Sequence, residues 1–352
     1  MNAKTNPGRF FEDFRLGERI VHATPRTVTD GDCALYAALY GSRFALHSSA
    51  AFAASLHLPR APVDDLLAFN LVFGKTVPDL SLNAIANLGY AAGRFGTPLY
   101  CGDTVSATST VIGLKQNRDG QTGVLYVRSV GVNQQGAMVV DYCRWVMVRK
   151  RDASSAAPEA VVPDLPQAVA AAELIVPAGL RCDRYDTALA GSPYLWEDYQ
   201  IGEKIDHIDG MTLEEAEHML ATRLYQNTAR VHFNQHVEKE GRFGRRIIYG
   251  GHILSLARAL SFGGLANAIR IAALNGGRHV APTFAGETVY AWSEVLDKMP
   301  VPGRGDLGAL RLRTLATKDR PCADFPGKKA DGQYDPAVVL DFDYTVLMPA
   351  RG

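Results

Sequence analysis

The chain has 352 residues, and its formal charges cancel, with 37 Lys and Arg against 37 Asp and Glu. A neutral chain has no overall field to attract nucleic acid or an anionic membrane, although a small polar or acidic substrate stays open. The length exceeds the roughly 250 to 300 residues that one hydrophobic core supports, so we expect two domains. Because no run of about 18 apolar residues occurs, we expect no membrane span.

Cysteine usage and the N-terminal segment indicate the compartment. The five cysteines are scattered and form no CxxC pair. An odd and scattered set argues against a disulfide framework or a zinc site and favours a reducing compartment. The first residues also lack the apolar core of a signal peptide. The sequence therefore predicts a cytoplasmic protein.

The chain repeats itself at long range. FFEDFRLGERI at residues 10–20 returns as LWEDYQIGEKI at residues 195–205, an offset of 185. The same offset aligns GVLYVR at 123–128 with GALRLR at 308–313. A repeat this long is a duplicated domain rather than a solenoid unit of roughly 20 to 50 residues.

Two parts of the repeat align at an offset other than 185. PLYCGDTV at 98–105 aligns with PTFAGETV at 282–289 after a slip of one residue. Near the end, VVDYCRWVM at 139–147 aligns with VLDFDYTVL at 339–347, which implies an insertion around residues 318–335 of the second copy. The predicted organisation is therefore two domains, 1–150 and 193–352, joined by an Ala- and Pro-rich linker, 151–192.

Each copy predicts the same elements in the same order. A helix with a threonine N-cap is expected in residues 27–41 and again in 211–226. A loop carrying a histidine follows, and then an apolar segment long enough for a buried central helix, at 66–77 and 252–269.

The rest of each copy is β-like, with short runs separated by Gly or Asn turns, at 103–115, 122–134 and 137–150 in the first copy. This pattern predicts an α+β fold, an antiparallel sheet wrapped round a central helix. Alternating βα units, GxGxxG and GxxxxGK[ST] are all absent from the sequence, so no nucleotide-type phosphate cradle is expected.

The loop at residues 224–236 and the helix start that follows carry groups suited to proton transfer and to binding negative charge. A histidine there titrates near neutrality and is suited to moving protons. Gly250 and Gly251 let the backbone N–H groups of the helix start approach a ligand on which negative charge develops. The first copy has Asp64 and Asp65 at this place, which would cap the helix and repel an oxyanion. We therefore expect the second copy to hold the working site and the first a degenerate one.

These residues resemble the MaoC-like or R-specific enoyl-CoA hydratase family of hotdog folds. The family signature has an Asp, four residues and a His, and later a His-Gly pair that opens the central helix. Asn227, His232 and Tyr249-Gly250 stand at these positions. The resemblance covers nearly the whole chain twice and implies a double hotdog, two tandem hotdog domains.

Within this family, the YQNTARVHFN loop and the YGGH helix start most resemble the mesaconyl-CoA hydratases. The resemblance implies reversible hydration of an enoyl-CoA thioester, mesaconyl-CoA (2-methylfumaryl-CoA) to β-methylmalyl-CoA. CoA would be part of the substrate, and no separate cofactor is implied. Because hotdog units bury their sheet edges by pairing, a homodimer is expected.

The resemblance implies roles for particular residues. His232 and Asn227 are the expected catalytic residues, and Gly250, Gly251, Tyr249 and Arg230 are expected to bind the thioester or substrate. An amide at the Asp position cannot exchange a proton, so we expect Asn227 to orient water. His232 would then transfer protons alone or with one of the acids nearest in sequence, which are Asp30, Asp32, Asp64, Asp65, Glu214 and Glu215.

Three other histidines are weaker candidates than His232. His47 aligns with His232 in a less polar loop and is expected to be structural or to line a pocket. His252 suits packing as well as catalysis. His236 lies four residues after His232 and could share a metal with it on a helix, but no third ligand follows at a suitable spacing, so no metal is expected.

Two other functions stay open from sequence. An acyl-CoA thioesterase would use the same oxyanion donors, with water attacking the carbonyl carbon instead of the β-carbon. A non-catalytic acyl-CoA-binding module would carry Asn227 as the mark of a decayed site.

Overall fold

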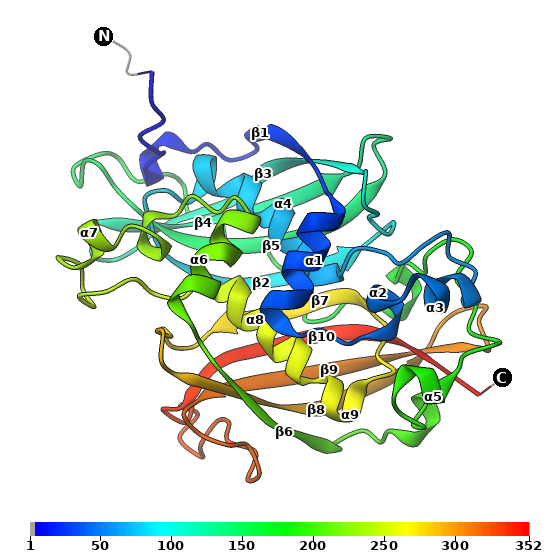
Figure 1. The fold of residues 1–352 in the computed structure, drawn as a ribbon. Helices are drawn as coiled ribbons and strands as arrows, with labels where there is room; N and C mark the ends of the chain where they lie inside the picture. Colours follow the sequence, from blue (N-terminus) through cyan, green and yellow to red (C-terminus); the bar gives the residue numbers. More distant parts are fainter. Residues whose placement is uncertain (1–3, 352) are drawn as a thin grey trace.

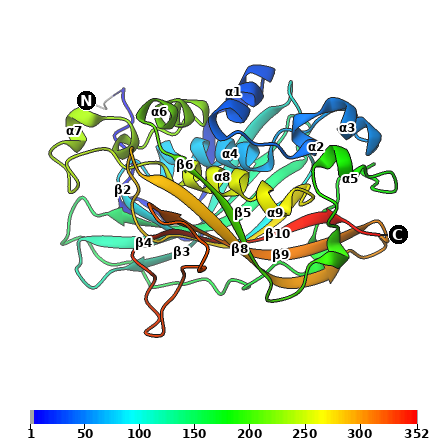
Figure 2. The ribbon, with the colours of Figure 1, turned by 60° about the horizontal axis from the view of Figure 1, so that its bottom comes forward.

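One ten-stranded antiparallel sheet organises the chain, and the helices lie over one of its faces (Figures 1 and 2). The computed structural model describes residues 4–351. The strands are β1 (Arg19–Thr27), β2 (Ala84–Phe95), β3 (Thr104–Gln116), β4 (Thr122–Val132), β5 (Met138–Arg149), β6 (Lys204–Thr212), β7 (Arg270–His279), β8 (Thr288–Pro300), β9 (Leu307–Lys318) and β10 (Val338–Pro349). The α-helices are α1 (Asp30–Tyr40), α2 (Ala45–Ser48), α3 (Ala50–Ser55), α4 (Asp65–Leu80), α5 (Thr187–Ala190), α6 (Glu215–Leu224), α7 (Gln235–Glu238), α8 (Gly250–Leu260) and α9 (Phe262–Leu265). Short 3-10 turns are η1 (Phe11–Asp13), η2 (Ala171–Glu173), η3 (Trp196–Asp198) and η4 (Arg230–His232).

The strand order shows how the duplication is built. The sheet runs β1-β3-β4-β5-β2-β7-β10-β9-β8-β6, so each copy supplies five strands and the copies meet edge to edge at β2 and β7. The central helices α4 and α8 pack on the inner face of this shared sheet (Figure 1). The α+β double hotdog is therefore confirmed.

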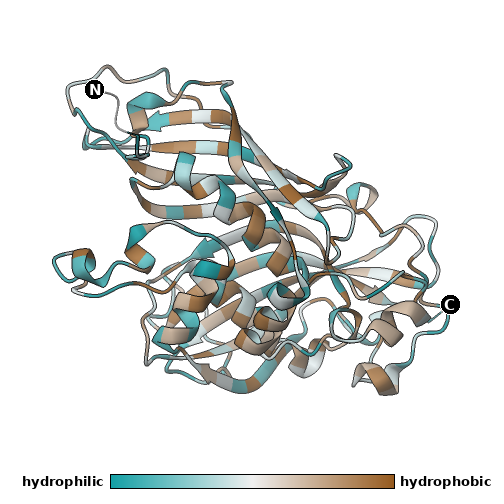
Figure 3. Cartoon of the chain, turned by 45° about the horizontal axis from the view of Figure 1, so that its top comes forward, coloured by the Kyte–Doolittle hydropathy of each residue, from teal (hydrophilic) through white to brown (hydrophobic). Residues whose placement is uncertain are grey.

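Residues at the same repeat position meet across the seam. The hydroxyls of Tyr40 and Tyr225 lie 2.7 Å apart. Asn70 Nδ2 on α4 donates to Ser255 Oγ on α8 at 3.2 Å. Both pairs are 185 residues apart, so the two copies pack around a local two-fold axis, and one apolar core includes residues of both helices. In Figure 3 the apolar residues concentrate on the strands and central helices and the polar ones on the outer loops.

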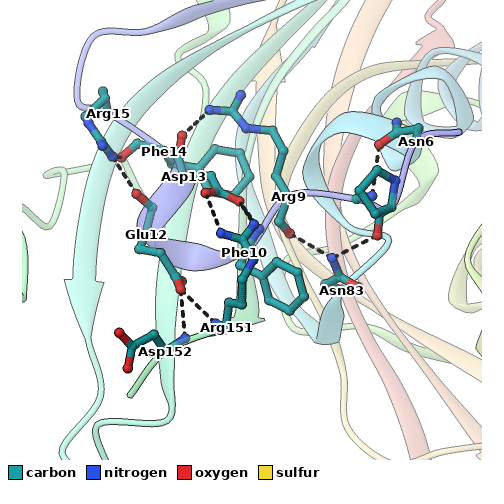
Figure 4. A network of polar contacts seen from close by, with 12 residues as sticks. Asn6, Arg9, Phe10, Glu12, Asp13, Phe14, Arg15, Asn83, Arg151 and Asp152 are labelled. Carbon is teal, nitrogen blue, oxygen red and sulfur yellow. Dashed lines mark hydrogen bonds and ion pairs between the residues drawn. The ribbon is translucent and has the colours of Figure 1, made fainter. Parts of the chain in front are cut away.

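The repeated opening segment fastens the end of each half-sheet. Glu12 Oε1 accepts the backbone N–H groups of Arg151 and Asp152, at 2.8 and 3.0 Å, and Arg151 also pairs with Asp13 (Figure 4). Glu197 accepts the N–H of Arg351 at 3.0 Å, and Asp198 pairs with the same arginine at 2.6 Å. The motif is therefore structural, because it holds the chain just after β5 and β10.

Two sequence-based expectations about helices were wrong. The segment predicted as one helix over 252–269 is helical as α8 only to Leu260. Gly263 and Gly264 then leave the helical conformation, Gly264 with φ of 99°, and β7 begins at Arg270. The threonine N-cap is present in the first copy as Thr29, whereas the N-cap residue of α6 is Glu214, whose side chain makes no capping hydrogen bond.

The connector between the copies is packed against the sheet rather than free. Val161 forms a β-bridge with Leu114. Asn275 Oδ1 on β7 accepts the backbone N–H of Val169 at 2.9 Å. Further on, Leu180 and Cys182 are buried in an apolar cluster with α3. Among residues 4–351, no helix is long and apolar enough to cross a membrane.

The aromatic residue of each opening segment packs on a glycine, which predicts a stability effect. A Cβ at Gly308 would overlap the ring of Trp196, and one at Gly123 would overlap Phe11, its repeat partner. We expect Gly308→Ala to lower the free energy of unfolding by about 1 to 3 kcal/mol, the usual cost of overpacking. Urea unfolding measures this. Gly305→Ala is the control, because no atom lies within 4 Å of a Cβ built there; equal effects of the two changes would contradict the packing account.

Candidate active site

The N-terminus of α8 presents backbone N–H groups without a side-chain cap. Tyr249 is the N-cap residue, and its side chain makes no capping hydrogen bond. The first N–H groups of a helix have no intrahelical acceptor, so those of Gly250 and Gly251 can bind an oxygen that carries negative charge. Both residues must be glycine, because a Cβ would overlap the His279 ring at Gly250 and Asn70 Oδ1 at Gly251.

The matching helix of the first copy is closed. Asp64 Oδ1 accepts the N–H of Leu66 at 2.9 Å and caps α4. Asp65 stands at the repeat position of Gly250 and is buried, with its Oδ2 accepting the N–H of Ile271 at 2.8 Å. A carboxylate therefore occupies the first-copy helix start that is open in the second.

His232 lies beside the α8 start with one nitrogen free. Its Nδ1 is 3.0 Å from the carbonyl oxygen of Ile247. Since a carbonyl only accepts, Nδ1 carries the proton and Nε2 is left as a base. Burial lowers the pKa of His232 to about 4, so the ring is neutral at pH 7. Its centroid is 5.4 Å from that of Tyr249.

His47 is held in the same way, with Nδ1 3.2 Å from the carbonyl oxygen of Pro62, the repeat partner of Ile247. Its Nε2, however, lies 3.7 Å from the Asp65 carboxylate. His47 and Pro62 line a cavity of about 390 Å³, together with Asp64 and Tyr36. The first-copy histidine thus faces an acid where the second-copy histidine faces an open helix start.

Asn227 is buried in the loop before His232. Its Oδ1 accepts the N–H of Ala229 at 3.0 Å, so the oxygen stabilises a turn, and the Nδ2 group has no hydrogen-bond acceptor among the described residues. The loop packs directly on α4, because a Cβ at Gly74 would overlap the Tyr225 carbonyl oxygen and approach Asn227 N to 3.5 Å. Helix α4 of the first copy therefore supports the second-copy loop that carries Asn227.

Four residues that the sequence did not single out complete the site. His218 Nε2 accepts the N–H of Tyr249 at 2.9 Å and so fixes the entry to α8. The Tyr249 hydroxyl donates to Asn70 Oδ1 at 3.0 Å. His279, whose ring covers Gly250, lies 3.3 Å from the Tyr90 hydroxyl. Asn70 and Tyr90 belong to the first copy, which explains why motifs of the second copy alone could not reveal them.

The remaining candidates lie elsewhere or play other parts. His252 is buried with Nδ1 2.9 Å from the Tyr40 hydroxyl, a packing position. Arg230 is exposed, two residues before His232. His236 is on α7, which is separate from η4, so it does not share a helix face with His232. Within residues 4–351 no three His, Cys, Asp or Glu side chains are arranged to hold a metal.

Most of the acids expected to assist His232 are engaged elsewhere. Asp32 pairs with Arg26 at 2.5 Å, and Glu215 pairs with Arg246. Asp64 and Asp65 belong to the α4 start, as described above. The His232 ring lies beside the rings of His218 and Tyr249 and the Ile247 carbonyl, none of which is an acid.

The histidines around α8 predict a steep pH dependence of stability. Burial is the first cause that lowers the pKa of His232, His252 and His279 to about 4, and that of His218 to about 2. Since the unfolded chain has pKa values near 6.5, it binds more protons than the folded chain as pH falls below 6.5. Stability is therefore complete above pH 6.5 and is lost toward pH 4, by up to about 1.4 kcal/mol per pH unit for each histidine.

Urea unfolding at pH 7, 6 and 5 measures this loss. A matched variant is His218→Gln, whose side-chain oxygen can accept the Tyr249 N–H but cannot titrate, so its stability should fall less steeply. A free energy of unfolding that does not change between pH 7 and pH 5 would contradict the assigned burial of these rings.

Comparison with known proteins places this site in a family. A family model described as mesaconyl-CoA hydratase matches residues 2–330. The β-methylmalyl-CoA dehydratase of Chloroflexus aurantiacus is 71% identical over 352 residues, covering 100% of both chains. The mesaconyl-CoA hydratase of Cereibacter sphaeroides is 60% identical over 346 residues, covering 98% of this chain and 99% of that one.

A solved structure shows the same fold. The crystal structure of a putative MaoC domain protein dehydratase from Chloroflexus aurantiacus superposes with a TM-score of 0.98 at 71% identity and covers 100% of both chains. The match extends over both copies, the shared sheet and the α8 start. The chain therefore belongs to the mesaconyl-CoA hydratase family of MaoC-like double hotdog proteins.

Proposed function

We propose that this chain is a hydro-lyase that adds water reversibly across the C=C bond of mesaconyl-CoA and forms β-methylmalyl-CoA. The relatives that match it end to end carry the names of this reaction in its two directions. The observation that carries the proposal is the neutral His232, with Nε2 free, beside the uncapped N–H groups of Gly250 and Gly251.

The geometry suggests the order of events. The thioester oxygen accepts hydrogen bonds from the α8 start, where the helix dipole favours negative charge. His232 Nε2 takes a proton from water, and the hydroxide adds to the β-carbon while the C=C electrons move onto the thioester as an enolate. The protonated His232 then returns the proton to the α-carbon. The sum is one added water, and no further cofactor is needed.

Asn227 and the first copy support this reaction without transferring protons. The Asn227 amide donors would hold the attacking water. Asn70 holds the Tyr249 hydroxyl, and His218 holds the Tyr249 amide. We therefore propose that 193–352 is the catalytic domain, that 1–150 is a degenerate copy serving as its support, and that 151–192 is the connector.

The exposed side of the site suits the CoA part of the substrate. Arg230 is exposed and begins η4, the turn that carries His232. Arg245 stacks on the Phe284 ring at 3.9 Å, and Lys318 lies 5.7 Å from the same ring. Cations in this arrangement can bind phosphates, so we assign the CoA phosphates to this side. The homodimer and the cytoplasmic location stay predictions.

Removing the base tests the proposal. We expect His232→Asn to lower kcat/KM for mesaconyl-CoA at least about 100-fold, the lower end of general acid–base contributions. The loss should appear in kcat, because proton transfer occurs in the transition state. Loss of absorbance of the conjugated thioester measures the rate.

His47→Asn is the matched control, since the two histidines share a repeat position and the same carbonyl contact. It should keep the wild-type rate within a few-fold. The proposal would fail if both variants lost activity equally, or if His232→Asn kept it. Release of free CoA in step with turnover would instead indicate thioester hydrolysis.

The pH profile of kcat/KM gives a second test. A general base must be neutral, and because the folded pKa of His232 is lowered to about 4, the neutral form persists well below pH 6.5. We therefore expect activity to hold from pH 7 to pH 5.5 and to fall only on approach to pH 4. Enzyme held at each pH and returned to pH 7 controls for unfolding. An acid limb centred near pH 6.5, with full recovery on return, would contradict the assignment.

A further inference from the structure

A buried arginine next to the site has no carboxylate partner within residues 4–351, and two of its three nitrogens have no hydrogen-bond acceptor there. Arg144 on β5 points toward α4 and is 1% exposed. Its Nη2 donates to Thr76 Oγ1 at 2.8 Å and to Ser81 Oγ at 3.0 Å. Its Nε and Nη1 find no acceptor among the described residues, and no described carboxylate pairs with it. An arginine stays charged in a protein, so this is a buried cation without a counter-charge.

The other buried cations are better satisfied. Arg270 lies 3.7 Å from Asp65 and donates to the Gly96 carbonyl at 2.6 Å. Lys75 donates to the Thr24 carbonyl and to Gln226. Arg144 alone among them has neither a carboxylate nor a carbonyl oxygen as partner within residues 4–351.

The duplication supplies an internal comparison. Arg258 on α8 stands at the repeat position of Phe73, and Ser261 at that of Thr76. Arg258 Nη1 donates to Ser261 Oγ at 3.2 Å and its Nη2 donates to the Ala268 carbonyl, so both terminal nitrogens have an acceptor. Arg258 thus shows that a buried arginine can find a carbonyl acceptor in this fold. At the repeat position of Arg144 itself stands Tyr344 on β10, buried with its hydroxyl 3.0 Å from Thr314 Oγ1, so packing at that place does not require an arginine.

Arg144 is connected to the site through a series of packed aromatic rings. Its guanidinium carbon is 4.3 Å from the centroid of Phe73. The Phe73 ring packs on Tyr249 and Tyr90, with centroids 5.7 and 6.2 Å apart. Tyr249 in turn contacts His232, and Tyr90 contacts the ring that covers Gly250. Phe73, with Tyr249 and Tyr90 beyond it, thus stands between the guanidinium and the α8 start.

We propose that Arg144 binds the free carboxylate of the substrate's acyl group and so selects dicarboxylic acyl thioesters. This inference rests on the proposed function. With the thioester oxygen on the α8 start, an acyl chain that extends past Tyr249 and Tyr90 would reach Phe73, and movement of the Phe73 ring would let its carboxylate meet the guanidinium. The carboxylate then supplies the missing acceptor. A monocarboxylic acyl group leaves the buried cation unpaired and is rejected for that reason.

The test compares kcat/KM for mesaconyl-CoA and crotonyl-CoA, which lacks the second carboxylate. We expect Arg144→Met to lower the ratio of the two values about 30-fold or more, the range for breaking a buried charge pair. Arg144→Lys keeps the charge and should retain part of the ratio. Arg258→Met is the matched control: it removes a buried arginine that has its own partners, and the ratio should stay that of the wild type.

A second measurement does not depend on the folding of any variant. Wild-type protein should be inhibited more strongly by succinyl-CoA than by butyryl-CoA, by about tenfold or more, because only the former offers a carboxylate. Equal inhibition, or an unchanged substrate ratio in folded Arg144→Met, would overturn the carboxylate assignment. Wild-type protein that hydrates neither substrate would instead overturn the proposed function, so the two failures are distinguishable.

Discussion

The candidate active site depends on the N-terminus of α8, which no described side chain caps. At the α8 start, two glycines keep side-chain atoms away from the first N–H groups, and Tyr249 provides no cap. Free amides at a helix N-terminus are costly to bury unless they find acceptors, so the surroundings must hold them open. His218 fixes the entry to the helix, and Asn70 fixes the Tyr249 side chain. The proton transfer proposed for His232 requires this open helix end, because the N–H groups there would bind the thioester oxygen on which negative charge develops.

Duplication explains how such an end can be kept. In the first copy the same helix start is closed by Asp64 and Asp65, the second of which also approaches His47. That copy is free to serve as support, and its helix α4 carries Asn70 and Gly74 against the second-copy loop. The contacts between Tyr40 and Tyr225 and between Asn70 and Ser255 hold the copies in register. On the proposed function, divergence would have left one copy as the support and the other as the reactive half.

The repeat made much of this predictable. It located both copies and aligned His47 with His232. It also showed that Asp64 and Asp65 stand where the second copy has the open start of α8. Sequence reasoning missed residues that are distant in the chain and meet only in the fold. His279 comes from the end of β7, Tyr90 from β2 and Arg144 from β5. Their roles depend on which strands meet at the seam, which no local pattern encodes. The overlong helix prediction failed because an apolar run continued through Gly263 and Gly264 into β7, and periodicity alone does not mark that change.

The central claim is that each chain has one working site, at the α8 start, and a first copy whose own site is closed. Calorimetric titration with methylsuccinyl-CoA, the saturated and unreactive analogue of the proposed substrate, tests this most directly. The account predicts one molecule bound per chain. Two molecules bound per chain with similar affinity would show that the first copy also accepts the thioester, and would contradict the account.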